Sequence, residues 1–434
     1  MQQNENASCQ KKINPIHWVP TVYFAMGLPL ISLNLVSVVM FKDLGIDNKS
    51  IAFWTSWLLL PWSLKPIFSL VMETFGTKKK YVVFTELISA VLFGLIVFAL
   101  PLPDFFSVTL ALMGAIAISG STHDIAGDGI YLSELDTTTQ SRYSGWQGAF
   151  YNLAKVLANG GLVFLAGWLI RSMNLTITQS WQTIMFICAV ILFLVGIYHW
   201  RVLPTDEPKK TGSFRDKTQE LWEVFISFFR KKFIWIYLVF IFLYRFAEGL
   251  VMKIVPLFLK DAVEKGGIGL TNEQYGLVYG TFGTVAFIIG SISAGYYVSR
   301  FGLKKVLFSL VCMFNIPFAV YLLFAVFQPQ QISVIALGIV GEYFGYGFGF
   351  VGLTLFMMQQ IAPGKYQMAH YAFANSLMNL GVMLPGMISG YLSDLVGYKM
   401  FFIYVMVATI PAFLITYFIP FTYDDSGKRK KTLS

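Results

Sequence analysis

Two aspartates in the middle of a long apolar stretch have the spacing of a proton-carrying site. Asp124 and Asp128 are four residues apart, so on a helix both carboxyl groups lie on one face and can interact. Burial and a neighbouring like charge make a carboxyl group hold its proton more tightly, as a proton-coupling site near neutral pH requires. The alternative is a static pair neutralised by Lys65 or Lys155, or a helix end close to water.

A second group of charges within apolar stretches combines both signs. Arg245 and Glu248 are three residues apart, and Glu342 stands in another apolar stretch. Arg245 either neutralises Glu248 or offers its planar fork to a carboxylate or another anion of a substrate. Glu248 and Glu342 are further candidates for proton coupling, and Glu342 could instead be the partner of a nearby cation.

Other polar residues of the apolar stretches could contact a substrate. A charge facing lipid would cost about 2.5 to 3.5 kcal/mol, so each such cation must face protein or water. The candidate substrate-binding residues are Lys65, Lys155, Arg245, Lys253, Asn152, Asn375 and Trp62. The two asparagines would serve equally well as hydrogen bonds between helices, and Trp62 as packing rather than as a surface for a sugar ring. Glu86 and His123 are expected to be structural.

Membrane-spanning helices are the elements that must position these residues. The chain is 56% apolar and only 13% charged, and its mean hydropathy is +0.64. A stretch of about 20 apolar residues crosses a hydrocarbon layer of ~30 Å as a helix, which satisfies its own backbone groups. Twelve such spans are predicted, at 16–41, 51–72, 80–100, 105–132, 143–170, 181–202, 233–259, 271–298, 303–327, 332–359, 366–393 and 398–420.

One long polar interruption divides these spans into two sets of six. It predicts an N-terminal six-helix bundle over 1–203, a cytoplasmic linker over 204–232 and a C-terminal bundle with a basic tail over 233–434. In the linker, apolar residues recur at helical spacing opposite Glu220 and Glu223, as in an amphipathic helix on an anionic membrane surface; a plain tether is the alternative. These apolar residues are Leu221, Trp222, Phe225, Phe228 and Phe229.

Two short sequence echoes relate the halves. Residues 75–79, Phe-Gly-Thr-Lys-Lys, are repeated as Phe-Gly-Leu-Lys-Lys at 301–305, and residues 149–152, Ala-Phe-Tyr-Asn, as Ala-Phe-Ala-Asn at 372–375. In both cases the second copy follows the first by nearly the same number of residues. The halves are therefore interpreted as parallel repeats related by an axis normal to the membrane. The expected fold is an all-α polytopic membrane protein with twelve transmembrane helices in two pseudo-symmetric six-helix bundles.

The charge distribution predicts the orientation of the chain. The net charge is +9, and most Lys and Arg residues stand in the loops on one side of the predicted spans. The positive-inside rule places both termini and the central linker in the cytoplasm, in an inner or plasma membrane. Because the basic residues lie in short loops, no nucleic-acid partner is expected.

Several classes of chemistry lack their sequence signals. Cys9, Cys188 and Cys312 are widely spaced, which indicates neither a disulfide framework nor a metal site. No phosphate-binding loop of the Gly-x-x-x-x-Gly-Lys-Ser/Thr type occurs, so an ATP-driven pump is not expected. The protein is expected to be a monomer in membrane lipid, without a cofactor and without enzymatic activity. An intramembrane enzyme, with Asp124 and Asp128 as catalytic acids, is the remote alternative.

The six-plus-six pattern and the Phe-Gly-x-Lys-Lys loops resemble the major facilitator superfamily of secondary transporters. A narrower resemblance is to AmpG-type muropeptide permeases and their acetyl-CoA transporter relatives. It rests on Gly-Leu-Pro-Leu at 27–30, Lys65-Pro66, Ser-Thr-His-Asp-Ile-Ala-Gly-Asp-Gly at 121–129, Tyr-Arg-Phe-Ala-Glu at 244–248 and Glu342. The chain departs from the superfamily's loop motif at Glu73 and Thr77, and it is shorter than the best-known muropeptide permeases.

This resemblance implies a function and a site. Helices 1, 4, 7 and 10 would line a central cavity, which brings Asp124, Asp128, Arg245, Glu248 and Glu342 to its walls. The expected function is secondary active import of a small solute by proton symport with alternating access. The expected solute is an anhydro-muropeptide or a related amino-sugar oligosaccharide, and the alternative is another sugar or acetyl-CoA.

Overall fold

The computed structural model describes residues 13–74, 77–204 and 214–423. These ranges are almost entirely helical and contain no strand. Many large apolar side chains point outward, and Phe98, Leu337 and Phe418 are each 74% exposed. Side chains of this kind face lipid when the helices span a membrane. The prediction of an all-α polytopic membrane protein is confirmed.

The N-terminal half contains six apolar spans. Three of its spans are built from more than one helix. In two of them a π-helical turn joins the helices, at Ser32–Val36 between α1 and α2 and at Val156–Leu162 between α8 and α9. The third span consists of the three consecutive helices α3, α4 and α5. The helices are α1 (Val19–Ile31), α2 (Ser37–Asp43), α3 (Asn48–Trp57), α4 (Leu60–Ser63), α5 (Lys65–Thr74), α6 (Lys78–Ala99), α7 (Phe105–Glu134), α8 (Thr137–Lys155), α9 (Val163–Ser172) and α10 (Ile177–Val202).

The C-terminal half follows helix α11 and repeats this plan. Its spans also contain π-helical turns, at Gly276–Phe282 and Met357–Ile361. The helices are α11 (Phe214–Phe229), α12 (Ile234–Lys260), α13 (Asn272–Tyr275), α14 (Gly283–Phe301), α15 (Leu303–Asn315), α16 (Ala319–Phe327), α17 (Ile332–Phe356) and α18 (Gln367–Phe418).

The described helices differ from the twelve predicted spans in two respects. Ten helical stretches in the described ranges are long and apolar enough to cross a membrane. One of them, α18, is two helices joined at Gly397, whose φ of 74° breaks the helical backbone. The predicted span 51–72 is instead divided into α3, α4 and α5, where Pro61 and Pro66 lack the N–H that a continuous helix needs. The predicted loop at residues 75–76 lies outside the described residues.

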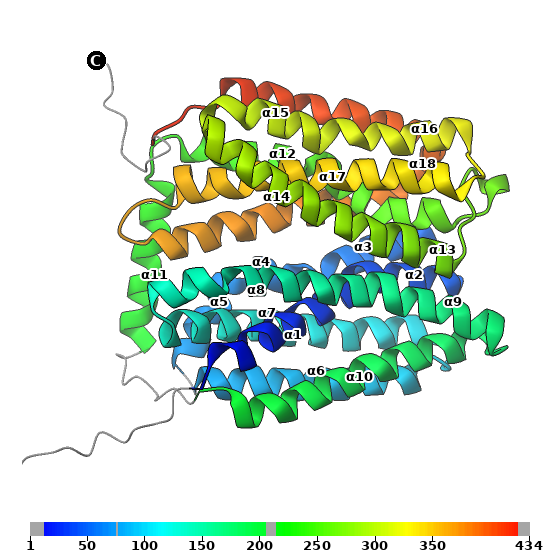
Figure 1. The fold of residues 1–434 in the computed structure, drawn as a ribbon, viewed down its shortest axis with the longest axis horizontal. Coiled ribbons are helices and arrows are strands. Elements are labelled where there is room, and N and C mark those ends of the chain that lie inside the picture. Colours follow the sequence, from blue (N-terminus) through cyan, green and yellow to red (C-terminus); the bar gives the residue numbers. More distant parts are fainter. Residues whose placement is uncertain (1–12, 75–76, 205–213, 424–434) are drawn as a thin grey trace, which may run out of the picture.

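The two halves form two layers, as Figure 1 shows, with α1–α10 in one and α12–α18 in the other. Helix α11 lies at one end of the molecule, where it contacts α5 of the N-terminal half and both α12 and α18 of the C-terminal half. At the opposite end, which we call the far end, α9 contacts α13 and α3 contacts α18. The far end therefore joins the halves directly.

Helix α11 carries an apolar side against the C-terminal half. Phe228 is fully buried, with its ring centroid 5.5 Å from that of Phe373, and Ser227 is hydrogen-bonded to His370 over 2.9 Å. On another side, Trp222 is 61% exposed and stacks on Phe225 at a centroid distance of 5.4 Å. An amphipathic helix with exposed aromatic rings at the predicted cytoplasmic surface fits contact with lipid headgroups.

The predicted orientation can be tested by labelling. We expect a cysteine at Lys265, exposed at the far end, to react with a membrane-impermeant maleimide added outside intact cells. A cysteine at Lys304, exposed at the start of α15, should react only after the membrane is opened. The background is a cysteine-free variant, in which Cys9, Cys188 and Cys312 are replaced. Labelling in the reverse order would overturn the predicted topology.

Candidate functional site

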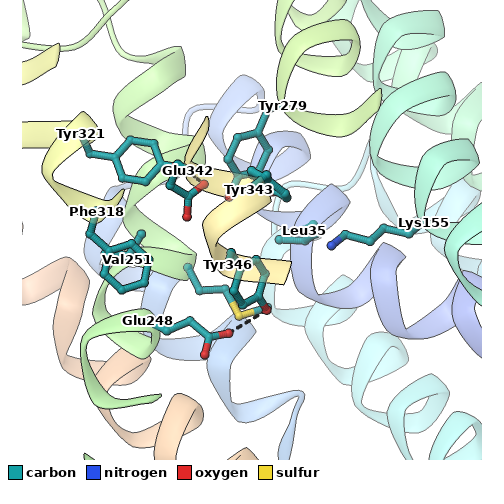
Figure 2. Close-up of a pocket in the computed structure, with 11 residues that line it drawn as sticks. Leu35, Lys155, Glu248, Val251, Tyr279, Phe318, Tyr321, Glu342, Tyr343 and Tyr346 are labelled. Carbon is teal, nitrogen blue, oxygen red and sulfur yellow. Dashed lines mark hydrogen bonds between the residues drawn. The ribbon is translucent and has the colours of Figure 1, made fainter. Parts of the chain in front are cut away.

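A pocket lies between the halves, mainly within the C-terminal half, and Figure 2 shows its lining. Helix α12, helix α17 and the turn before α14 supply most of its walls, while the N-terminal half contributes one apolar and one cationic side chain. The lining residues are Leu35, Lys155, Glu248, Val251, Met252, Tyr279, Phe318, Tyr321, Glu342, Tyr343 and Tyr346. The pocket thus combines aromatic rings with charges of both signs.

Lys155 brings a cation from the N-terminal half to the aromatic rings of the other half. Its Nζ lies 4.9 Å from the ring centroid of Phe287, 5.4 Å from that of Tyr343 and 6.0 Å from that of Tyr346. Figure 2 shows this nitrogen directed toward the pocket. Within the described part of the chain no carboxylate comes within ion-pair distance of it. Cation–π attraction holds the ammonium group where an anion could approach it.

Glu342 brings a buried carboxyl group to the same pocket. It is 4% exposed, and it accepts a hydrogen bond of 2.7 Å from the hydroxyl of Tyr321. Among the described residues no lysine, arginine or histidine forms an ion pair with it. A carboxyl group in such surroundings requires a proton or a cationic group of a ligand.

Arg245 and Glu248 neutralise each other on α12. Two guanidinium nitrogens of Arg245 donate to the two carboxylate oxygens of Glu248, each over 2.5 Å, and the Tyr346 hydroxyl donates to Glu248 over 2.8 Å. The guanidinium group also lies 5.3 Å from the ring centroid of Phe350. In this conformation the bidentate fork is engaged with Glu248, and only the carboxylate side of the pair lines the pocket.

Helix α7 places its two aspartates in different environments. Asp124 is buried, accepts a hydrogen bond from Trp62 Nε1 over 2.8 Å and forms an ion pair with Lys65 over 3.0 Å. Its second oxygen has no hydrogen-bond partner among the described residues. Asp128 is exposed and accepts a hydrogen bond of 2.7 Å from the Tyr23 hydroxyl. Asp124 is therefore paired with Lys65, while Asp128 forms no ion pair with a described residue.

The expected site residues therefore fall into two groups. One is the pocket with Lys155, Glu342 and Glu248, the last of which is paired with Arg245. The other is the α7 site with Asp124, Asp128, Lys65 and Trp62. Three expected residues lie in neither group. They are Asn152, whose amide bonds to Gly148 O within its own helix over 2.8 Å, the half-buried Asn375, and Lys253.

Lys253 instead joins the halves. Its side chain is 1% exposed, and its Nζ donates to the backbone oxygen of Asn34 over 2.9 Å and to that of Thr55 over 3.3 Å. Asn34 lies in the π-helical turn Ser32–Val36. Such a turn disturbs the regular backbone ladder of a helix, and here one of its carbonyls receives a bond from the other half.

The tyrosines of the pocket were not expected from the sequence. Tyr343 and Tyr346 are three residues apart on α17, a spacing that puts both rings on one side of a helix. The neighbouring Gly347 allows α14 to approach, because a Cβ there would overlap the backbone carbonyl of Phe287. The close approach holds the Phe287 ring beside Lys155. The pairing of aromatic and glycine residues in α17 is the signal that could have indicated this site.

Ion pairs close the far end between the halves. Lys42 and Asp261 meet over 2.6 Å, and Asp43 and Lys260 over 2.9 Å. Burial alone would raise the pKa of Asp261, but hydrogen bonds from Lys42, Tyr398 and Asn48 outweigh it and lower that pKa below its usual range. The closed contact is therefore most stable above the ordinary carboxyl pKa, and it loses this contribution as the pH falls through the lowered pKa.

Beneath these ion pairs the helices touch through their backbones. A Cβ on Gly276 would come within 2.6 Å of the backbone oxygen of Gly160, and one on Gly280 would overlap that of Asn159. The two π-helical turns, Val156–Leu162 and Gly276–Phe282, pack directly on each other. At Gly276 and Gly280 the backbones of the two halves meet directly, and this contact closes the far end.

Comparison with known proteins assigns the family. The family model of the Major Facilitator Superfamily matches residues 21–356 and 241–433. This chain belongs to the Major Facilitator Superfamily. Members of this family and the structural neighbours are transporters rather than enzymes, and a membrane transport function is therefore established.

Individual relatives cover nearly the whole chain. A protein of Haemophilus influenzae described as uncharacterized is 24% identical and covers 93% of this chain and 94% of its own length. A protein of Rickettsia felis named putative transporter AmpG 4 is 22% identical, and the match covers 91% of this chain and 93% of that protein. The solved structure of a D-xylose-proton symporter superposes with a TM-score of 0.68 at 12% identity, and the match covers 96% of this chain and 99% of that one. This similarity shows a shared fold.

The closure of the far end yields a prediction. In Asp261→Asn the neutral side chain no longer attracts Lys42, which should weaken the contact by about 1.5 kcal/mol and shift the open-to-closed ratio roughly tenfold. Spin labels at Met173 and Lys265, exposed on opposite halves, should then report a longer-distance population by double electron–electron resonance.

Glu264→Gln provides the matched control, because Glu264 is an exposed acid in the same loop. Its distance distribution should equal that of the parent protein. An unchanged distribution in Asp261→Asn would contradict a role of this ion pair in closure.

Proposed function

We propose that this transporter imports a small solute together with protons by alternating access. The solute is an anhydro-muropeptide or a related amino-sugar oligosaccharide. One observation carries the proposal: the pocket between the halves holds an ammonium group, Lys155, and a carboxyl group, Glu342, neither of which forms an ion pair with any residue that the structure describes. A solute that is bound by both would be in contact with both halves of the protein.

The closed far end supports the alternating-access part. On the predicted outer side the halves are joined by the contacts of Lys42, Asp43 and Lys253. Import requires these contacts to break so that solute enters the pocket from outside, and to reform before release. Ion pairs and hydrogen bonds between halves suit this cycle because each is made in one conformation and replaced by water in the other.

The chemistry of the pocket supports an amino-sugar solute. Tyr279, Tyr343 and Tyr346 offer ring faces and hydroxyl groups, which suit the apolar faces and hydroxyls of sugars. Lys155 suits a carboxylate, such as that of a peptide or lactyl substituent. The named AmpG relatives point in the same direction. Acetyl-CoA carries several phosphate groups, which would require more cations than this pocket supplies from the described residues.

The proton is proposed to bind at helix α7. Asp128 is exposed and forms no ion pair with a described residue. Asp124 is paired with Lys65, and its second oxygen has no hydrogen-bond partner among the described residues. Protonation of Asp128 removes a negative charge beside Asp124, so the two carboxyl groups and Lys65 respond to pH as one unit. Glu342 is a second candidate, because its carboxyl group lies in the substrate pocket itself.

Helix α7 gives a test of proton coupling. We expect Asp128→Asn to abolish accumulation driven by an alkaline interior, while exchange of solute across the vesicle membrane continues, because exchange needs no net proton movement. Asp124→Asn should have a milder effect. The measurement is uptake against a concentration gradient in proteoliposomes, with Glu134→Gln, an exposed acid at the end of the same helix, as control. Full accumulation by the double variant Asp124→Asn/Asp128→Asn would exclude this mechanism.

Lys155 gives a test of solute recognition. Lys155→Met should raise the KM for an anhydro-muropeptide at least tenfold, since a charge-assisted bond contributes about 1.5 to 3 kcal/mol. Lys155→Arg keeps the charge and should retain part of the affinity. Lys304→Met, exposed in the first turn of α15, should change nothing. Uptake of anhydro-muropeptides, amino sugars and acetyl-CoA is compared in the same vesicles. Equal KM values for Lys155→Met and the parent protein would remove Lys155 from the binding site.

A further inference from the structure

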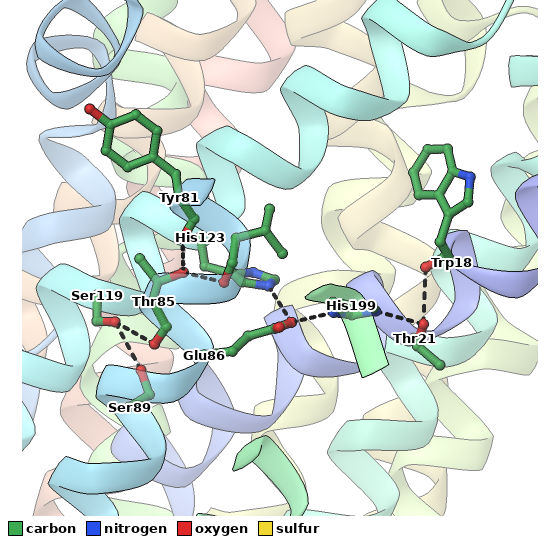
Figure 3. A network of polar contacts seen from close by, with 10 residues as sticks. Trp18, Thr21, Tyr81, Thr85, Glu86, Ser89, Ser119, His123 and His199 are labelled. Atoms are coloured by element: carbon green, nitrogen blue, oxygen red, sulfur yellow. Dashed lines mark hydrogen bonds and ion pairs between the residues drawn. The ribbon is translucent and has the colours of Figure 1, made fainter. Parts of the chain in front are cut away.

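Three side chains outside the pocket meet in the interior of the N-terminal half. Glu86 of α6 lies between His123 of α7 and His199 of α10, as Figure 3 shows. Glu86 Oε1 is 3.0 Å from His123 Nε2 and 2.7 Å from His199 Nδ1. The three residues are 2%, 3% and 0% exposed. We call them the Glu86 cluster.

The net charge of the Glu86 cluster depends on one proton. A carboxylate with two neutral imidazoles carries a charge of minus one. Within the described ranges no lysine or arginine forms an ion pair with Glu86, so its charged contacts are the two histidines. An isolated charge is strongly disfavoured in a buried site. One additional proton makes the cluster neutral, and a second would charge it again.

The hydrogen bonds indicate which residue holds this proton. An imidazolium ring donates from both nitrogens, so both need an acceptor. His199 meets this condition, because its Nδ1 faces Glu86 and its Nε2 is 2.8 Å from Thr21 Oγ1. The Thr21 hydroxyl can give its own hydrogen to the backbone oxygen of Trp18 over 3.1 Å, which leaves its oxygen free to accept.

His123 differs in this respect. Its Nε2 faces Glu86, but its Nδ1 has no hydrogen-bond partner among the described residues. A neutral ring with a hydrogen on Nε2 alone satisfies this arrangement, since an unpaired acceptor nitrogen is less costly than a buried charged donor without an acceptor.

We infer that the Glu86 cluster is a proton-binding site of its own, in which His199 carries the proton as an imidazolium ion paired with the Glu86 carboxylate and His123 stays neutral. The site lies apart from the solute pocket and is formed by helices α1, α6, α7 and α10. It goes beyond the proposed transport function, since it assigns a second place where the protein holds a proton.

The surroundings connect this site to the carboxyl groups of α7. His123 precedes Asp124 in the chain, and its ring lies within electrostatic range of Asp128. The helices around the site carry further charged or titratable groups. Tyr23 of α1 donates to Asp128, and Lys65 of α5 pairs with Asp124. The others are Lys78 and Tyr81 on α6 and Tyr198 and Arg201 on α10. His123 therefore links the cluster to the helix that carries both aspartates, so a change in the charge of the cluster can act on them.

The protonation state can be measured directly. The chain has only 4 histidines, so nitrogen-15 imidazole spectra of the protein in lipid nanodiscs can be assigned by replacing His17, His123, His199 and His370 one at a time. At pH 7.5 we expect two protonated ring nitrogens for His199 and one for His123. In Glu86→Gln the His199 ring should become neutral, because its counter-charge is gone. Two neutral rings in the parent protein would overturn the inference.

A matched control and a transport readout complete the test. Ser119→Ala removes a buried hydrogen bond between α7 and α6, where Ser119 donates to Thr85 O over 2.8 Å, without changing a charge. It should leave the His199 spectrum unchanged. If the cluster acts on the aspartates, Glu86→Gln should shift the pH midpoint of uptake by about one unit relative to Ser119→Ala. A His199 imidazolium with an unshifted midpoint would exclude that action.

The spectra separate this inference from the proposed function. They report the proton on His199 whether or not the protein transports amino sugars, and loss of coupling in Asp128→Asn does not depend on the cluster. Failure of one assignment therefore leaves the other measurable.

Discussion

A charge inside a hydrocarbon layer needs a partner, and this constraint determines how the helices of this transporter fit together. Almost every buried charge of the described chain meets an opposite charge, a ring face or a set of carbonyl oxygens. Asp124 has Lys65, Arg245 has Glu248, and Glu86 has two histidines. These pairs lie within one half and are preserved when the halves move as bodies. They stabilise each bundle but do not depend on the position of one bundle relative to the other.

A smaller set of charges is partnered across the halves. Lys253 donates to carbonyls of the N-terminal half, Lys155 lies over rings of the C-terminal half, and Lys42 meets Asp261. Each of these contacts must break when the halves separate. In the proposed alternating-access cycle, a solute or water replaces the lost partner when the pocket or the far end opens. Residues for conformational change and residues for bundle stability are therefore distinguished by where their partners lie.

The sequence predicts contacts that depend on local spacing and misses those that depend on distant packing. The three-residue separation of Arg245 and Glu248 predicted their pairing as one of two alternatives, and the all-α membrane fold followed from the apolar spans. By contrast, Lys253 finds its acceptors 219 and 198 residues away, at carbonyls that carry no signal in the side-chain sequence. The division of the span at 51–72 was missed, although Pro61 and Pro66 within it are breaks in backbone hydrogen bonding.

The contact of the two glycine-bearing π-helical turns has a consequence for the kind of motion that is possible. Side chains between moving bodies can change rotamer and allow a graded separation, whereas two rigid backbones in van der Waals contact cannot adapt. At Gly276 and Gly280 the nearest atoms of the N-terminal half are backbone atoms. The contact therefore acts as a stop that defines one closed position of the two halves. On this side the halves are either in full contact or clearly separated. A transporter with such a stop has a narrow distribution of closed states, which limits leakage of small ions past the far end.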